Sequence, residues 1–189
     1  MKHVQLVAIL FCLVTGSGCQ SLQLAIKKKP LPPARPQPPP LFWDDTVTEG
    51  KPSIVIALTD QRAYLYKGRR LVGDSTISSG RKGFETPPGH YKITQKDRNH
   101  ASNLYGDYVD ADGEVVKANV DVNKDHRPSG TTFRGAKMPF FMRFSHGYGL
   151  HAGYLPGYRA SHGCIRMPLE MAHHYFDSSS VGTRVTVEE

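Results

Sequence analysis

Short apolar runs separated by turn residues occupy most of the chain after residue 50. Residues 53–58 form a β-branched run, and an alternating run at 63–66 follows a short polar connection, which predicts a β-hairpin. The same kind of pattern predicts further strands at 71–77, 90–95, 138–144, 148–151 and 181–187. The folded part is therefore expected to be mainly β.

Two segments depart from this strand pattern. Residues 99–135 are polar, contain scattered Gly and Asp, and show little periodicity, which predicts a long loop or lid with one short strand at most. Loops of this length in compact domains tend to be functional. A helix is predicted after Met167, where Pro168 suits the first turn and apolar residues repeat at helical spacing as far as Phe176.

The N-terminus has the pattern of an export signal. Lys2 and His3 are followed by an apolar run at 4–14, which is too short to cross a bilayer, and by small residues before Cys19. A cysteine directly after such a site resembles a bacterial lipoprotein signal, in which a lipidated cysteine begins the mature chain. We expect a signal peptide at 1–18, a membrane anchor on Cys19 and a periplasmic location. The alternative is a plain cleaved signal with an incidental Cys19.

A Lys/Pro-rich linker is predicted at 19–50, because residues 27–40 cannot bury a core and favour a stiff polyproline II spacer. Lys and Arg number 24 and Asp and Glu 17. Five of the basic residues and none of the acids precede Trp43, so the rest of the chain carries 19 minus 17, or +2. Nucleic-acid binding would need a basic stripe on the folded part, so no nucleic acid is expected as a partner. The basic tail suits an anionic membrane or envelope surface instead.

Cys164 is the candidate nucleophile. It is the only free thiol left if the signal is removed and Cys19 is lipidated. A lone cysteine usually packs as a small hydrophobe, but His162 and Arg166 stand two residues to either side of this one. In an extended segment both would share its face and lower the thiol pKa from about 8.5 toward neutrality. Gly163 would permit close approach, and the N–H groups of Gly163 and Cys164 are candidate oxyanion donors.

A general base is expected upstream of the cysteine, where His146 and His151 are the candidates. His151 is favoured because it ends an apolar strand, where a backbone carbonyl can hold one ring nitrogen. His146 lies beside Gly147 and suits an exposed or packing role. A zinc hydrolase using both histidines with His162 and Cys164 is an alternative, but these spacings fit no common zinc motif. We expect neither a metal nor another cofactor.

The motif Ser-His-Gly-Cys-Ile-Arg-Met at 161–167, with His151 thirteen residues before the cysteine, resembles the signature of the L,D-transpeptidases, the YkuD-type domain of the bacterial cell wall. Residues 79–93 resemble the family's Gly and Thr-Pro segment, and residues 138–142 resemble its strand before the histidine. The resemblance runs from 53 to 187 and places the domain at 51–189. It implies a β-sandwich of mixed strands with small flanking helices and a lid over a Cys–His site.

The resemblance also implies a reaction. Cys164 would attack the carbonyl before the terminal D-alanine of a peptidoglycan stem tetrapeptide and form a thioester. His151 would act as general base and then as general acid, and His162 would orient the substrate or assist the oxyanion site. An amine would then take the acyl group, whereas attack by water would make the protein a carboxypeptidase.

Three further residues have expected roles around this centre. The Ser161 hydroxyl is expected to orient the loop, and Ala152, where many members have Gly, to form the wall beside the base. Arg166 would bind a substrate carboxylate or, as an equal alternative, form a structural ion pair. A wall-binding lipoprotein without activity is the last alternative, but it would have no need of intact Cys164, His151 and His162.

Overall fold

The computed structural model of this chain describes residues 41–189. The predicted signal peptide, Cys19 and residues 20–40 of the predicted linker lie outside the described residues, so export and lipidation stay predictions. No helix within 41–189 is long and apolar enough to cross a membrane. Residues 41–189 belong to a single folded unit.

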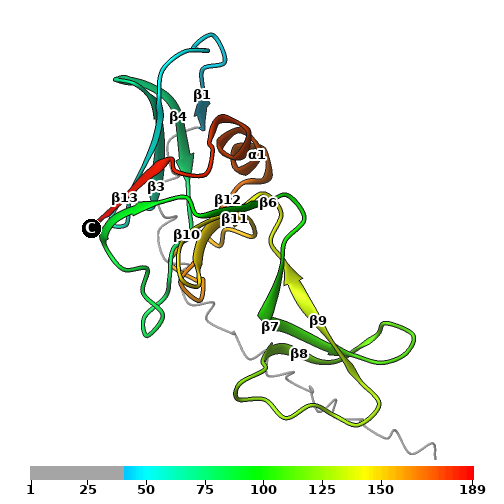
Figure 1. Cartoon of the computed structure of the whole chain (residues 1–189). Coiled ribbons are helices and arrows are strands. Elements are labelled where there is room, and N and C mark those ends of the chain that lie inside the picture. Colours follow the sequence, from blue (N-terminus) through cyan, green and yellow to red (C-terminus); the bar gives the residue numbers. More distant parts are fainter. Residues whose placement is uncertain (1–40) are drawn as a thin grey trace, which may run out of the picture. The chain divides into compact units, whose positions relative to one another are not determined.

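The first of three sheets has six strands, built around the predicted hairpin (Figure 1). Alternate residues of the hairpin, such as Ile54, Ile56 and Leu65, are buried, as a strand with one face on the core requires. The first strand of the hairpin, Pro52–Ala57, also pairs in parallel with the C-terminal strand, Arg184–Glu188, so the sheet is mixed. In spatial order the strands are β1 (Phe42–Trp43), β4 (Arg70–Thr76), β3 (Arg62–Lys67), β2 (Pro52–Ala57), β13 (Arg184–Glu188) and β5 (Gly89–Lys92).

The second sheet carries the candidate site. Its spatial order is β12 (Ile165–Met167), β11 (Tyr148–Ala152), β10 (Phe141–Ser145) and β6 (Gln95–Asp97). The central strands β10 and β11 are antiparallel, whereas β11 and β12 are parallel and set His151 opposite Arg166. His151 is in β11 and Cys164 directly precedes β12, so the pairing of these two strands brings the histidine and the cysteine to one region.

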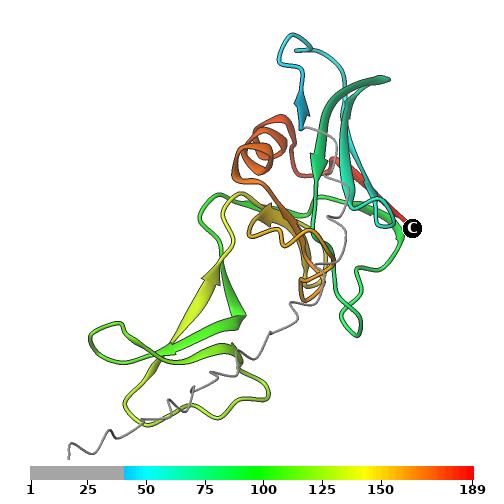
Figure 2. The ribbon, with the colours of Figure 1, turned by 180° about the vertical axis from the view of Figure 1, so that it is seen from behind.

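The third sheet corrects the prediction of a loop at 99–135. This segment forms three antiparallel strands in the order β8 (Val115–Asp121), β7 (Ala101–Val109) and β9 (Thr132–Lys137). Most of its residues are partly or fully exposed, so neither face has to be apolar and no clear alternation marks the strands. Register shifts beside Gly106 disturb the pattern further. Figures 1 and 2 both show this sheet beside the other two, joined to them through β6 and β10.

The predicted helix is α1 (Leu169–Ser178), which begins directly after Pro168. Its buried stripe contains Met171, Ala172, Tyr175 and Phe176, and it packs against β4 and β11. The Tyr175 hydroxyl donates a hydrogen bond of 2.6 Å to the carbonyl of Ala63 in β3. α1 is the only helix within residues 41–189, where we expected small flanking helices.

Three predicted boundaries also need correction. The strand expected at 138–144 begins only at Phe141, because Phe140 has a positive φ of 58° that no regular strand accommodates. The strand expected at 90–95 is divided between β5 and β6, which lie in different sheets. Part of the expected linker belongs to the fold, since β1 pairs with β4 and Val47 is buried in the core.

Candidate active site

The loop that presents Cys164 is fixed by its own serine. The Ser161 hydroxyl donates to the carbonyl of Cys164 at 2.5 Å and accepts the N–H of Gly163 at 3.0 Å, so it orients the loop as expected. Gly163 has φ +114°, and a Cβ there would lie 2.4 Å from the Tyr148 ring. Because its N–H already bonds to Ser161, Gly163 does not offer the oxyanion donor that we expected in this structure. Position 163 requires glycine because of its positive φ and the nearby Tyr148 ring.

Thr86, in the connection between β4 and β5 of the first sheet, also holds the loop that presents Cys164. The buried Thr86 hydroxyl donates to the carbonyl of Gly163 at 2.7 Å and accepts the N–H of Gly80 at 3.1 Å. Backbone bridges at Ser78 with Arg166 and at Gly80 with Ser161 complete the connection. Thr86 belongs to the Thr-Pro motif that the sequence made visible, but only the structure reveals that it holds the cysteine loop.

Cys164 is the only cysteine among the described residues, and its side chain is partly buried. Its Sγ lies 3.5 Å from the Gly147 carbonyl oxygen, and the Gly149 N–H also points to the sulfur. Burial raises the thiol pKa, and the Gly149 N–H and the charges of Arg143 and Arg166 only partly oppose that rise. The expected fall toward neutrality is therefore wrong. The sequence showed the neighbouring charges but not the burial that outweighs them.

His151 lies at the end of β11 with a side chain that is almost fully buried. Its Nδ1 donates to the carbonyl of Ala152 at 2.8 Å, which is the carbonyl partner that we expected. This hydrogen bond assigns the proton to Nδ1 and leaves a lone pair on Nε2. Burial lowers the pKa of His151 to about 4, so its imidazole is neutral at pH 7.

Ala152 does not form the wall that we expected beside the base. It is buried and does not line the cavity, so its contribution is the carbonyl that holds His151. Its own N–H donates to the carbonyl of Pro139 at 2.9 Å. This second bond fixes the backbone on which the histidine depends.

His162 is held by three side chains. Its ring stacks on Tyr105 of β7 with centroids 4.1 Å apart, and it meets the Phe84 ring edge-on at 4.8 Å. Arg81 Nη2 lies 2.7 Å from His162 Nε2, and because arginine can only donate, Nε2 accepts and Nδ1 carries the proton. Burial and then Arg81 lower the pKa of His162. The chain turns at Gly163, so the argument that His162 shares a face with Cys164 does not hold.

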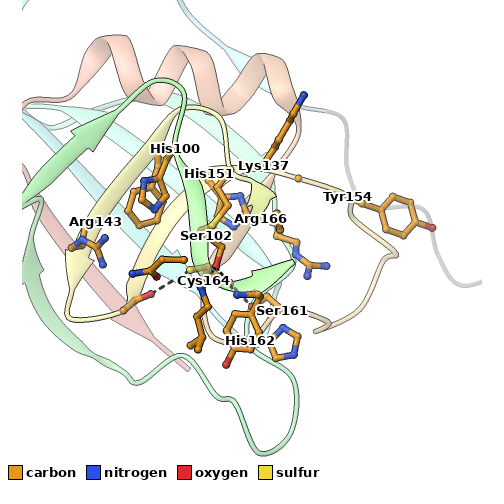
Figure 3. A pocket seen from close by; sticks show the side chains of 18 residues that line it. His100, Ser102, Lys137, Arg143, His151, Tyr154, Ser161, His162, Cys164 and Arg166 are labelled. Carbon is orange, nitrogen blue, oxygen red and sulfur yellow. Dashed lines mark hydrogen bonds between the residues drawn. The ribbon is translucent and has the colours of Figure 1, made fainter. Parts of the chain in front are cut away.

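These residues line one cavity with a volume of about 380 Å³. Figure 3 shows the side chains around it. His151, His162 and Cys164 line it from the second sheet and its loop, and residues of β7 and β9 line it from the third sheet. The segment predicted as a lid therefore does form one wall of the site. The volume of the cavity is within the range of small-molecule binding sites.

The charged side chains that line this cavity are all basic. Lys137, Arg143 and Arg166 line it, and no Asp or Glu does. Within residues 41–189 no carboxylate lies within 4.0 Å of a nitrogen of Arg166, so the structural ion pair that we held open for it is absent from that range. The cavity is therefore suited to a ligand with a carboxylate.

The alternative zinc site has no ligand set in the folded unit. Among residues 41–189, no three His, Cys, Asp or Glu side chains come together in a way that could hold a metal ion. His146 is exposed, as expected, and does not line the cavity.

Comparisons with known proteins identify the family of this chain. The YkuD family, described as the L,D-transpeptidase catalytic domain, matches residues 51–187. The chain therefore belongs to the YkuD family of L,D-transpeptidase catalytic domains. A solved L,D-transpeptidase from Mycobacterium smegmatis shares the fold with a TM-score of 0.56 and 18% identity, over 74% of this chain and 59% of that one.

Two curated relatives are similar in sequence. The probable L,D-transpeptidase YbiS of Escherichia coli is 31% identical over 78% of this chain, and the probable L,D-transpeptidase ErfK/SrfK of Salmonella typhimurium is 28% identical over 79%. The matched region makes up 47% of each relative, so the chain spans about half the length of these proteins.

Proposed function

We propose that this protein is a peptidoglycan L,D-transpeptidase with Cys164 as its nucleophile. One observation carries the proposal: Cys164 and His151 line the same cavity, which has three cationic side chains and no acidic one. The thiol would attack the carbonyl that precedes the terminal D-alanine of a stem tetrapeptide. A thioester forms as the bond to D-alanine breaks, and an amine acceptor then takes the acyl group.

The pKa values of the two groups indicate how the protons move. Burial raises the pKa of Cys164 and lowers that of His151, so the resting pair is a neutral thiol and a neutral imidazole. The proton therefore passes to His151 Nε2 as the sulfur attacks, not beforehand. The imidazolium that results is a strong acid because it is buried, and it can protonate the departing amine of D-alanine.

Substrate recognition in this proposal depends on the cationic wall. Arg166 is about half-buried, and burial lowers its pKa without neutralising it. A guanidinium in this setting binds a carboxylate with two parallel hydrogen bonds. Arg166 would therefore hold a free carboxylate of the stem peptide, while His162 orients the peptide from beside Cys164.

The location proposed for this activity is the periplasm, where peptidoglycan stems are found, with Cys19 as a lipid anchor. The sequence pattern at 1–19 supports this part of the proposal. Expression of the full chain with Cys19→Ser should move it from the membrane fraction to the soluble periplasmic fraction. A variant that stays with the membrane to the same extent as the unaltered chain would contradict the anchor.

The activity is tested with the full chain and a defined disaccharide tetrapeptide. Released D-alanine and a product joined to the supplied amine are expected, whereas Cys164→Ala should give neither and should fold normally by circular dichroism. Release of D-alanine without transfer, even at high amine concentration, would replace the transpeptidase with a carboxypeptidase. Turnover by Cys164→Ala would eliminate the cysteine mechanism altogether.

A further inference from the structure

A third histidine, His100, lines the cavity that contains Cys164, His151 and His162 (Figure 3). It lies between β6 and β7, where the chain passes from the second sheet to the third. Its ring stacks on the buried ring of Phe141, with centroids 4.2 Å apart and planes within 14°. The side chain keeps 20% of its surface exposed, so it is held in place and still open to the cavity. None of the proposed steps of acylation uses it.

Asp97 is a carboxylate partner for His100, of the kind that orients a histidine acting as a general base. His100 Nδ1 lies 3.1 Å from Asp97 Oδ2, and the other oxygen, Oδ1, accepts the N–H of Asn99 at 3.1 Å. A carboxylate can only accept at neutral pH, so Nδ1 carries a proton and Nε2 has the free lone pair. The carboxylate therefore fixes the orientation and the tautomer of the ring.

His151 and His100 are therefore suited to opposite tasks. His151 is held by a neutral carbonyl and is buried, which makes its imidazolium a good proton donor and its imidazole a weak base. His100 is held by a carboxylate and is more exposed, so its Nε2 is open to a molecule in the cavity. An acceptor amine of the lysine type has a pKa of about 10, so it arrives as an ammonium ion that cannot attack. Something in the cavity has to remove that proton.

We propose that His100, positioned by Asp97, is the base that deprotonates the acceptor amine, an inference that rests on the proposed transpeptidase function. Nε2 takes one proton from the ammonium ion, and the neutral amine attacks the thioester carbonyl. The C–N bond forms and the C–S bond breaks. The second proton lost by nitrogen passes through His151 to the Cys164 sulfur, which restores the thiol, and His100 releases its proton to water.

The test separates the two halves of the reaction in the full chain. Acylation is followed by the mass of the chain after mixing with a tetrapeptide donor, and transfer is followed by the decay of that adduct when an acceptor is added. Two acceptors are compared: an alkyl amine, which is an ammonium ion at pH 7.5, and hydroxylamine, which is largely neutral there. The variants are His100→Gln and Asp97→Asn.

His173→Gln is the matched control. His173 forms an Asp–His pair of the same kind, with Nε2 2.9 Å from Asp177 Oδ2, but it lies on α1 and does not line the cavity. His100→Gln should acylate within a few-fold of the unaltered chain and lose about 10²-fold or more in transfer to the alkyl amine. Transfer to hydroxylamine should stay within a few-fold. Asp97→Asn should show a smaller loss of the same kind, and His173→Gln none.

Three other outcomes would each contradict the inference for a different reason. Equal losses with both acceptors in His100→Gln and Asp97→Asn would show that the pair supports the structure and does not move a proton. Alkyl amine transfer at the original rate in both variants would show that His100 has no part in it. An unaltered chain that forms no adduct with the donor would overturn the proposed function, and with it this inference.

Discussion

Acid should destabilise this protein through His151. The side chain is 6% exposed, and burial lowers its pKa to about 4, whereas an unfolded chain has the ordinary histidine value of 6.5. Between these values the unfolded chain binds a proton at this position and the folded chain does not. The free energy of unfolding therefore falls as the pH drops below 6.5, and this contribution levels off below pH 4.

The size of the effect is set by the two pKa values. The pKa of His151 differs by about 2.5 between the unfolded and the folded chain, which corresponds to about 3 kcal/mol of stability lost at a pH below both values. About 2 kcal/mol of this is lost between pH 7.5 and pH 5. Other groups also titrate in this range, so the diagnostic quantity is a difference between variants. His151→Asn keeps an N–H that can bond to the Ala152 carbonyl and cannot be protonated. Its free energy of unfolding should therefore fall by about 2 kcal/mol less than that of the unaltered chain.

Urea unfolding of the full chain at pH 7.5 and pH 5, followed by circular dichroism, measures this difference. His146→Asn is the control, because His146 is an exposed histidine that does not line the cavity. The comparison uses the change with pH in each protein, because His151→Asn will also lose packing at both pH values. Equal pH dependence in the unaltered chain and His151→Asn would refute the claim that His151 is buried in its neutral form.

Three further substitutions test the loop and the cavity. Gly163→Ala should lower the melting temperature and reduce kcat by about 10²-fold or more, because φ +114° and the Tyr148 ring leave no room for a methyl group, and normal kcat would contradict this. Thr86→Val should cost about 1–3 kcal/mol of stability in urea unfolding, because two buried hydrogen bonds are lost, and Thr86→Ser should restore most of it. Arg166→Gln should raise KM for a donor with free carboxylates more than for its amidated analogue, and equal changes would remove Arg166 from carboxylate binding.

The predictable parts of the fold are those in which one face is buried. The hairpin of β2 and β3 and the helix α1 follow from alternation and from helical spacing, because each packs one face on the core. The sheet of β7, β8 and β9 could not be predicted, because most of its residues are partly exposed and its register shifts remove the alternation. Exposed, irregular strands leave no periodic signal in the sequence.

The site divides in a similar way. Local chemistry made Cys164 and His151 candidates, and the loop role of Ser161 follows from a hydroxyl three residues from the cysteine. Burial of the thiol could not be predicted, since it depends on packing between segments far apart in sequence. His100 and Tyr105 were missed for the same reason: only the fold of the third sheet brings them to the cavity.

The most direct test of the central claim is the mass of the full chain after brief mixing with a tetrapeptide donor in the absence of an amine. The account predicts an added mass equal to the donor minus D-alanine, located on Cys164 by peptide mapping, and no added mass on Cys164→Ala. An adduct on another residue, or D-alanine release with no adduct and full turnover by Cys164→Ala, would contradict it.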